Sequence, residues 1–268
     1  MNLLTSLRAG LVAAALVAAA SGTAPAHGAE LVVGAPSELV ECTGALSSAF
    51  LAREKGSRLR FVTAPSDDLY AKIESGEPID VYMSSQMALQ GQMLADGKMV
   101  YDSWTMYATG RLVLWAADPR FDVTKGLRLL ADPAVKRVAT VDAGSAYLLP
   151  TLTVLHSAGV LEKFDSARTD SPSMQAAVKA VQAGKAQVAI LSYETVLAAP
   201  MKGVGKYALI PESAYKDEFP GHAAVVTMHG AKNALAYRFI QFLKSAEAQA
   251  ILVPKGFMKP PLGSVDVR

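Results

Sequence analysis

Two short segments with the same ending carry the clearest chemical signal in the sequence. Gly34-Ala35-Pro36-Ser37 and Thr63-Ala64-Pro65-Ser66 each place a serine between a short β-type run and a helical pattern. A serine at a helix start offers a hydroxyl, and the first helical turn offers N–H groups without a partner inside the helix. These donors and the positive end of the helix dipole favour an anion. The two serines therefore predict either plain helix caps or two halves of an anion-binding site.

Three carboxylates follow these serines and complicate the prediction of an anion site. Glu38 comes directly after Ser37, and Asp67 and Asp68 come directly after Ser66. In a first helical turn an acidic side chain commonly stabilises the helix dipole from the solvent side by roughly 0.3–1 kcal/mol. A carboxylate that pointed into the site would instead oppose a fully deprotonated anion, and the ligand would then need a proton or a positive charge. Both interpretations stay open.

No catalytic or metal-binding pattern accompanies these residues. Cys42, the only cysteine, lies one helical turn after Glu38, and no histidine has a sequence signature that pairs with it. We expect a small buried hydrophobe, and a single cysteine cannot form an internal disulfide. The four histidines are scattered, and no Cys/His spacing is typical of a metal site. The sequence therefore predicts no enzyme, no metal and no cofactor.

Short apolar runs alternate with helical patterns along the chain and supply the framework. We expect helices from about Glu38 to Arg53 and from about Asp67 to Ser75, with period near 3.6. Nearly continuous apolar strands between helices indicate buried parallel sheets. In such sheets ligands bind beyond the carboxyl ends of the strands, where both serines fall. The predicted strands are Leu31–Val33, Leu59–Val62, Val81–Met83, Leu112–Trp115, Val138–Val141 and Val188–Leu191.

Two turn-rich segments, 110–119 and 211–222, divide the chain after residue 29 into thirds. We interpret them as crossings between two lobes. The first lobe is predicted to comprise residues 30–109 and 223–268, and the second lobe residues 110–222. The predicted fold class is thus α/β, with two lobes joined by a hinge and a mostly parallel sheet flanked by helices in each lobe.

Residues 1–29 predict export. Arg8 precedes an apolar run, and the small-residue stretch after it contains Ala24-Pro25-Ala26, a signal-peptide pattern. The run is shorter than the roughly 20 residues that span a bilayer, so we expect cleavage after Ala26 or Ala29, with an uncleaved anchor as the alternative. Basic and acidic residues number 26 and 24, without basic clusters among aromatics, so nucleic-acid binding is not predicted.

An extended motif then makes the chain recognisable. The segment from Leu69 to Ser84 carries the pattern Leu-x-x-x-Ile-Glu-x-Gly-x-Pro-x-Asp-Val-Tyr-x-Ser. This segment, the turn that ends at Ser37, the run Gly110–Trp115 and the stretch 242–257 together resemble the periplasmic molybdate-binding proteins, which are receptors of ABC transporters. The resemblance covers essentially the whole chain after the predicted signal peptide.

The resemblance implies a monomeric periplasmic binding protein with a two-lobed fold. Such a protein captures a tetrahedral oxyanion, molybdate or tungstate, in the cleft between its lobes, using neutral hydrogen-bond donors, and presents it to a membrane permease. Closure of the hinge would complete the site. The positions that match the family's ligand contacts are Ser37 and Ser66 in the first lobe and Tyr147, Met174 and either Ser192 or Tyr193 in the second.

Two alternatives remain at this stage. The same fold could bind a protonated oxyanion, a metal cation or a small cationic solute through Glu38, Asp67, Asp68 or Asp142. A periplasmic accessory protein that kept the receptor fold is the other alternative, because a fold does not fix a function.

Overall fold

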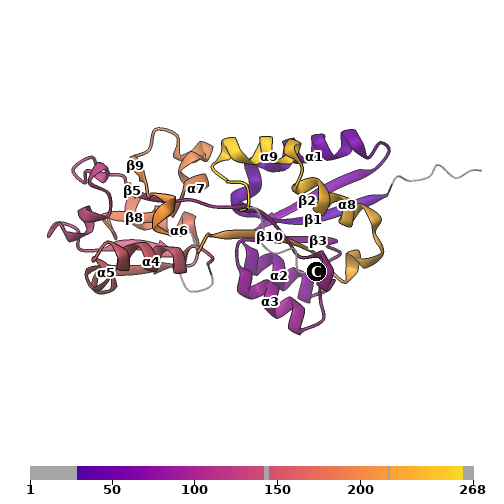
Figure 1. The fold of residues 1–268 in the computed structure, drawn as a ribbon, viewed down its shortest axis with the longest axis horizontal. Coiled ribbons are helices and arrows are strands. Elements are labelled where there is room, and N and C mark those ends of the chain that lie inside the picture. The colour runs from indigo at the N-terminus through magenta and orange to yellow at the C-terminus, as the bar shows by residue number, and fades with distance from the viewer. Residues whose placement is uncertain (1–28, 142–144, 216–217, 262–268) are drawn as a thin grey trace, which may run out of the picture.

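The computed structural model describes residues 29–141, 145–215 and 218–261, which form two lobes, each around its own five-stranded sheet (Figure 1). The first sheet has the strand order β2-β1-β3-β10-β4, and the second β7-β6-β8-β5-β9. The first sheet consists of β1 Glu30–Pro36, β2 Arg58–Ala64, β3 Val81–Ser84, β4 Thr105–Thr109 and β10 Gly221–Val226. The second consists of β5 Leu112–Ala116, β6 Val138–Val141, β7 Arg168–Ser171, β8 Val188–Ser192 and β9 Lys206–Leu209.

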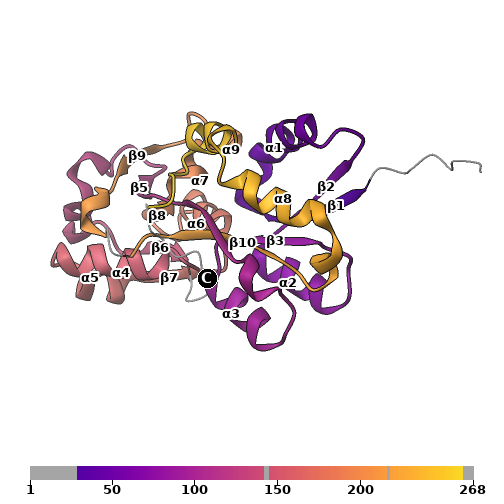
Figure 2. The same ribbon diagram turned by 45° about the vertical axis from the view of Figure 1, so that its right-hand side comes forward.

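Helices flank both sheets, as the views in Figures 1 and 2 show. The helices of the first lobe are α1 Val40–Arg53, α2 Ser66–Glu74, α3 Met87–Ala95, α8 Ala234–Leu243 and α9 Ala246–Leu252. Those of the second lobe are α4 Leu148–Ser157, α5 Leu161–Ala167, α6 Met174–Gln182 and α7 Tyr193–Leu197. The predicted α/β class with two mostly parallel sheets is therefore confirmed.

Each sheet contains one reversed strand, in the same position of the strand order. β10 is antiparallel to β3 and β4 in the first sheet, and β5 is antiparallel to β8 and β9 in the second. These two strands are also the ones by which the chain enters each lobe after crossing from the other. The lobes thus share one topology and meet where their reversed strands begin.

The chain crosses between the sheets in two adjacent segments. It leaves β4 at Thr109 and enters β5 at Leu112, and the Gly110 N–H donates to the Pro220 carbonyl of the returning segment over 2.8 Å. The boundary predicted at residue 223 is two residues late. Gly221 and His222 already pair with β4, because the antiparallel ladder begins directly after Pro220.

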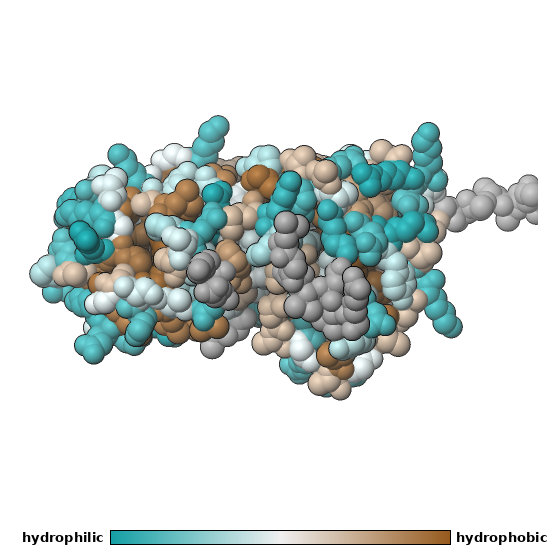
Figure 3. Space-filling view, in the orientation of Figure 1, coloured by the Kyte–Doolittle hydropathy of each residue, from teal (hydrophilic) through white to brown (hydrophobic). Residues whose placement is uncertain are grey.

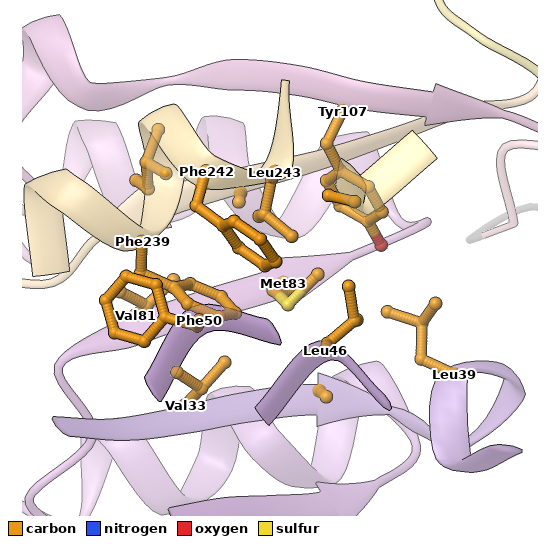
Figure 4. Close-up of a cluster of buried hydrophobic side chains, with 14 of the residues drawn as sticks. Val33, Leu39, Leu46, Phe50, Val81, Met83, Tyr107, Phe239, Phe242 and Leu243 are labelled. Atoms are coloured by element: carbon orange, nitrogen blue, oxygen red, sulfur yellow. The ribbon is translucent and has the colours of Figure 1, made fainter. Parts of the chain in front are cut away.

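Three phenylalanine rings pack together among aliphatic side chains in the core of the first lobe, part of which Figure 4 shows in close-up. The rings of Phe50 on α1 and Phe239 on α8 meet edge to face, with centroids 5.2 Å apart, and Phe242 packs beside both. Edge-to-face contact of this kind stabilises beyond the area it buries. Cys42 belongs to the same cluster with 1% of its surface exposed, so its thiol packs as the expected small hydrophobe.

The second lobe buries both faces of its sheet. Along β5, Leu112 and Leu114 belong to the hydrophobic cluster on one face, and Val113 and Trp115 belong to the cluster on the other. Alternate residues of a strand point to opposite faces, so a strand covered by helices on both sides needs apolar residues throughout. That requirement explains the continuous run Leu112–Trp115 in the sequence.

The surface contrasts with these cores. In Figure 3 hydrophilic residues cover most of the visible face, and hydrophobic residues gather mainly on the second lobe. Within the described part of the chain, no helix is long and apolar enough to cross a membrane. The predicted signal peptide falls outside the described residues, apart from Ala29.

Candidate ligand-binding cleft

A cavity of about 690 Å³ lies between the two lobes, and residues of both lobes line it. This volume falls within the range of roughly 300–1,000 Å³ that is typical of small-molecule sites. The lining follows the carboxyl ends of parallel strands in both lobes, where ligands bind in open α/β sheets. Polar side chains of the lining follow β1, β2 and β3 in the first lobe and β6, β7 and β8 in the second.

Ser37 and Ser66 both line the cavity, and neither side chain caps a helix among the described residues. The prediction of Ser-capped helices is therefore wrong in detail. Pro36 and Pro65 occupy the two N-cap positions, with φ −65° and −51°, so each serine falls one residue later, inside the first turn. A hydroxyl at that position is not directed at the N–H groups that an N-cap serves.

Glu38 faces the cleft as well, partly exposed but deep between the lobes. The Ser85 hydroxyl, which follows β3, donates to Glu38 Oε1 over 2.7 Å. Loss of water around the carboxylate raises the pKa of Glu38, and this effect outweighs the hydrogen bond from Ser85. The interpretation that Glu38 points to bulk solvent is therefore not supported.

A second carboxyl group reaches the cleft from the other lobe. Glu194, in the first turn of α7, lines the cavity and has only 5% of its surface exposed. Its Oε1 accepts a short hydrogen bond from the Tyr147 hydroxyl, while its Oε2 is buried with no hydrogen-bond partner in the described part of the chain. Burial raises the pKa of Glu194 to about 7, and the charge of Glu38 contributes to the increase.

The hydroxyl of Tyr147 connects Glu194 to the first lobe. It lies 2.9 Å from Nε2 of His222, which belongs to β10 and is completely buried. Burial lowers the pKa of His222 to about 3, so the imidazole is neutral. Tyr147 itself is 2% exposed, and its hydroxyl also lies against the crossing segment, where a Cβ atom on Gly110 would fall 1.9 Å from it. Tyr147 thus lines the cavity and joins the lobes at the hinge.

Two of the remaining second-lobe candidates, Met174 and Ser192, line the cavity. Met174 begins α6 at the cavity wall, after Ser173, whose side chain caps the helix by accepting from the Ala176 N–H over 3.1 Å. Ser192, at the end of β8, lines the cavity and its hydroxyl lies 2.8 Å from that of Thr195.

Tyr193 was the alternative to Ser192, and it lies elsewhere. Its ring packs under the Arg111 guanidinium, 4.4 Å from the ring centre, and against Tyr207. It is not among the cavity-lining residues of the described chain. Tyr193 packs on the same hydrophobic cluster as Ala189 and Leu191 of β8, so it continues the face of the sheet opposite to Ser192.

The other predicted carboxylates are less enclosed than Glu38. Asp67 lines the cavity and is exposed, and Asp68 is exposed on α2 away from the cavity lining. Asp142 lies outside the described residues.

The lobes contact each other across the cleft as well as at the hinge. The Ala146 N–H donates to the Ser85 carbonyl over 3.2 Å. On another side of the cleft, the Glu41 carboxylate accepts a hydrogen bond from the Ala199 N–H of the second lobe, and Lys255 Nζ lies 3.0 Å from its other oxygen. The structure therefore holds the two lobes together by direct hydrogen bonds.

Catalytic and metal-binding chemistry find no support in the described residues. Cys42 lines the cavity, but burial raises the pKa of its thiol to about 11, so the nucleophilic thiolate is scarce. No group of three or more His, Cys, Asp or Glu side chains in the described ranges could hold a metal ion.

Three polar residues of the site were missed by sequence reasoning. Ser85 and Glu194 each follow a strand within two residues of its end, so the rule about strand carboxyl ends could have identified them. His222 carries no such signal, because its partner Tyr147 is 75 residues away in the sequence.

Comparisons with known proteins agree with this architecture. The family model for bacterial extracellular solute-binding proteins matches residues 31–258. The chain is 30% identical to the molybdate-binding protein ModA of Rhodobacter capsulatus over 255 residues, 94% of this chain and 97% of that protein. It is 25% identical to the protein of the same name from Azotobacter vinelandii, over 96% of each.

Solved structures give the same result. The periplasmic molybdate-binding protein of Azotobacter vinelandii superposes with a TM-score of 0.70 at 25% identity, covering 86% of this chain and 99% of that one. These relatives are named as binding proteins. The chain belongs to the bacterial extracellular solute-binding protein family, in the group of two-lobed periplasmic receptors that includes these molybdate-binding proteins.

Proposed function

We propose that this protein is the periplasmic receptor of an ABC transporter and captures a tetrahedral oxyanion, of the molybdate and tungstate type, between its lobes. The observation that carries the proposal is the composition of one cavity. It collects Ser37 and Ser66 from the first lobe with Ser192 and the start of α6 from the second. Names of the full-length relatives supply the ligand class.

Hydroxyl and N–H donors would hold the anion without covalent chemistry. The side chains of Ser37 and Ser66 do not cap a helix, so their hydroxyls can turn toward a ligand. Hydrogen bonds to a charged partner are stronger than neutral ones, and they strengthen further when the lobes close and exclude water. Neither lobe supplies a complete set of donors. Binding and closure are therefore coupled, and the closed form is the one a permease would recognise.

Export fits this role. The predicted signal peptide would place residues from about Ala26 or Glu30 onward in the periplasm, where a receptor meets its solute. Sequencing of the N-terminus of protein recovered from the periplasmic fraction tests this part, and full-length protein in the membrane fraction would contradict it.

A thermal-shift screen tests the ligand class. Molybdate, tungstate, sulfate, phosphate and divalent metals are each added to the protein without residues 1–29. A ligand at about a hundredfold excess over its dissociation constant stabilises the folded state by roughly 2.7 kcal/mol, a shift that the assay resolves. We expect molybdate and tungstate to give the largest shifts. Stabilisation by a cation with no response to any oxyanion would overturn the proposal.

A further inference from the structure

The cleft presents carboxyl groups to a ligand that we propose to be an anion. Glu38 reaches it from the first lobe and Glu194 from the second. The other charged residues of the described lining are Glu41, Asp67, Lys179 and Lys255. Lys255 is paired with Glu41, and Lys179 and Asp67 are exposed, so no buried cation in the described part of the lining balances Glu38 or Glu194.

Hydrogen bonding does not compensate for this lack of positive charge. Glu38 accepts a hydrogen bond from the Ser85 hydroxyl on one oxygen, and its own backbone N–H contributes less, so the loss of water still outweighs both donors. Glu194 accepts a short hydrogen bond from the Tyr147 hydroxyl, and the Ser192 hydroxyl and its own backbone N–H contribute less, while its buried Oε2 has no hydrogen-bond partner among the described residues. An ionised carboxylate needs donors at both oxygens when it is withdrawn from water, whereas a protonated one carries its own donor. Both sites therefore favour the neutral carboxyl group, and burial raises the pKa of each.

None of the described groups packed around Glu194 carries a positive charge that could neutralise its carboxylate. His222 is neutral, with a pKa of about 3 and a buried, unpartnered Nδ1 in the described chain. Tyr147 and Tyr107 are buried phenols, and burial raises the pKa of each further above its ordinary value. Cys42 is a buried thiol with a raised pKa. Among the described residues none supplies a positive charge to Glu194, so a proton from solvent is what would neutralise it when a second negative charge enters the cleft.

We propose that Glu38 and Glu194 bind the oxyanion as neutral carboxyl groups, so that the cleft takes up protons together with its ligand and loses affinity as the pH rises. This inference rests on the proposed function. The count of protons in the complex is the same whether a proton resides on the carboxyl group or on an anion oxygen that donates to it. Each proton taken up makes the affinity fall by about tenfold per pH unit.

Isothermal titration calorimetry with molybdate tests the proposal. The titration is run from about pH 6 to about pH 8.5, at each pH in two buffers with different ionisation enthalpies, which counts the protons taken up per anion. We expect an uptake of about one proton or more near pH 8 and a matching decrease of affinity. Glu38→Gln and Glu194→Gln replace each carboxyl group with a neutral group of the same shape, and Glu162→Gln, at an exposed position on α5, is the matched control.

The glutamine variants at Glu38 and Glu194 test whether these two carboxyl groups account for the proton uptake. Each glutamine should reduce proton uptake, and the double variant should bind molybdate with little pH dependence, more tightly than the unmodified protein above about pH 8. Wild-type binding without proton uptake overturns the inference, as does an unchanged pH slope in the double variant. If Glu194→Gln does not fold, the wild-type proton count and Glu38→Gln still decide. Failure of every oxyanion to bind both wild type and double variant at any pH would instead overturn the proposed function.

Discussion

The two sides of the cleft use the same chemical group in different settings. Glu38 is held within its own lobe, by the hydroxyl of Ser85. Glu194 is held by Tyr147, whose hydroxyl also reaches His222 in the other lobe. A change at Glu38 therefore acts on the ligand site of one lobe. A change at Glu194 acts on the ligand site and on the junction between the lobes at the same time.

The origin of this difference lies in the reversed strands. β10 and β5 start where the chain crosses between the lobes, so a residue near the start of β10 lies within reach of the second lobe. His222 occupies that place, whereas Ser85 follows the parallel strand β3 and faces the cleft from one side. Two sheets with one topology thus provide one local site and one that depends on the hinge.

Replacement of Gly110 is the strongest way to break the hinge side. In Gly110→Ala the new Cβ atom would lie 1.9 Å from the Tyr147 hydroxyl, and the buried ring cannot withdraw without losing Glu194 and His222. We expect the free energy of unfolding to fall by about 3 kcal/mol, measured by urea denaturation.

The matched control for Gly110 lies in α1. Gly44 is exposed, and a Cβ atom there meets nothing within 4 Å. Gly44→Ala should raise the free energy of unfolding by roughly 0.5–1 kcal/mol, because alanine is the better helix former. Equal stability of the Gly110 and Gly44 variants would show that Tyr147 is not fixed at the hinge.

Glu194 and His222 on the hinge side should affect the pH dependence of stability in opposite directions. The pKa of Glu194 is raised to about 7, so its contribution to stability is complete below about pH 4.5 and is lost as the pH rises through 7. His222, with a pKa lowered to about 3 from 6.5, contributes in the opposite sense, since its stabilisation is complete above 6.5 and lost toward 3. In the wild type these two effects offset each other between about pH 4.5 and 6.5.

Glu194→Gln removes only one of the two opposing effects. The free energy of unfolding of the variant, minus that of the wild type, should therefore increase by about 2–3 kcal/mol between pH 4.5 and 7. Urea denaturation at several pH values measures it, with Glu162→Gln as a variant that should run parallel to the wild type. Parallel curves for Glu194→Gln would mean that this carboxyl group titrates normally.

How far the sequence predicted this site depends on the range of each signal. Strand ends and helix starts are local features, so the positions of Ser37 and Ser66 beside the cleft followed from the chain alone. The capping role did not, because the proline before each serine takes the N-cap position. Local patterns also left Ser192 and Tyr193 unresolved, since the chain changes from strand to helix between them.

The hinge-side contacts were beyond any local signal. Tyr147 meets Glu194 and His222 across 47 and 75 residues of sequence. Strand order and the reversed direction of β10 bring them together, and neither can be deduced from apolar periodicity. Burial of a carboxyl group is likewise a property of the assembled cleft. The first-turn acids Glu38 and Asp67 look alike in the sequence, yet the one lies deep beside Ser85 and the other is exposed.

The paired serines test the ligand side of the comparison. Ser37→Ala and Ser66→Ala should each weaken oxyanion binding by about 1.5–3 kcal/mol, the range for a hydrogen bond to a charged group. Because neither side chain caps a helix, the loss of folding stability should stay below the roughly 1 kcal/mol of a lost N-cap. Titration calorimetry and urea denaturation measure the two quantities. Ser48→Ala, exposed on α1, should change neither. Normal molybdate binding by both cleft variants would exclude these hydroxyls from the site.

The smallest effect is expected at the contact that joins the lobes outside the hinge. Glu41 accepts from the Ala199 N–H across the cleft and pairs with Lys255. The side chain remains about a quarter exposed (26%), so solvent and salt screen the interaction, and Glu41→Ala should weaken ligand binding by only about 0.5–1 kcal/mol.

The matched control for Glu41 is Glu247, which pairs with Arg53 inside the first lobe. Glu247→Ala removes a surface ion pair of the same kind that does not cross the cleft, so ligand affinity should stay at the wild-type value. Small-angle scattering supplies the second measurement, because loss of an interlobe contact should increase the radius of gyration of the ligand-free Glu41 variant and not that of the Glu247 variant. Equal affinities and equal radii for the two variants would show that Glu41 does not hold the lobes together, and would leave the hinge side, with Tyr147 and Glu194, as the principal connection between them.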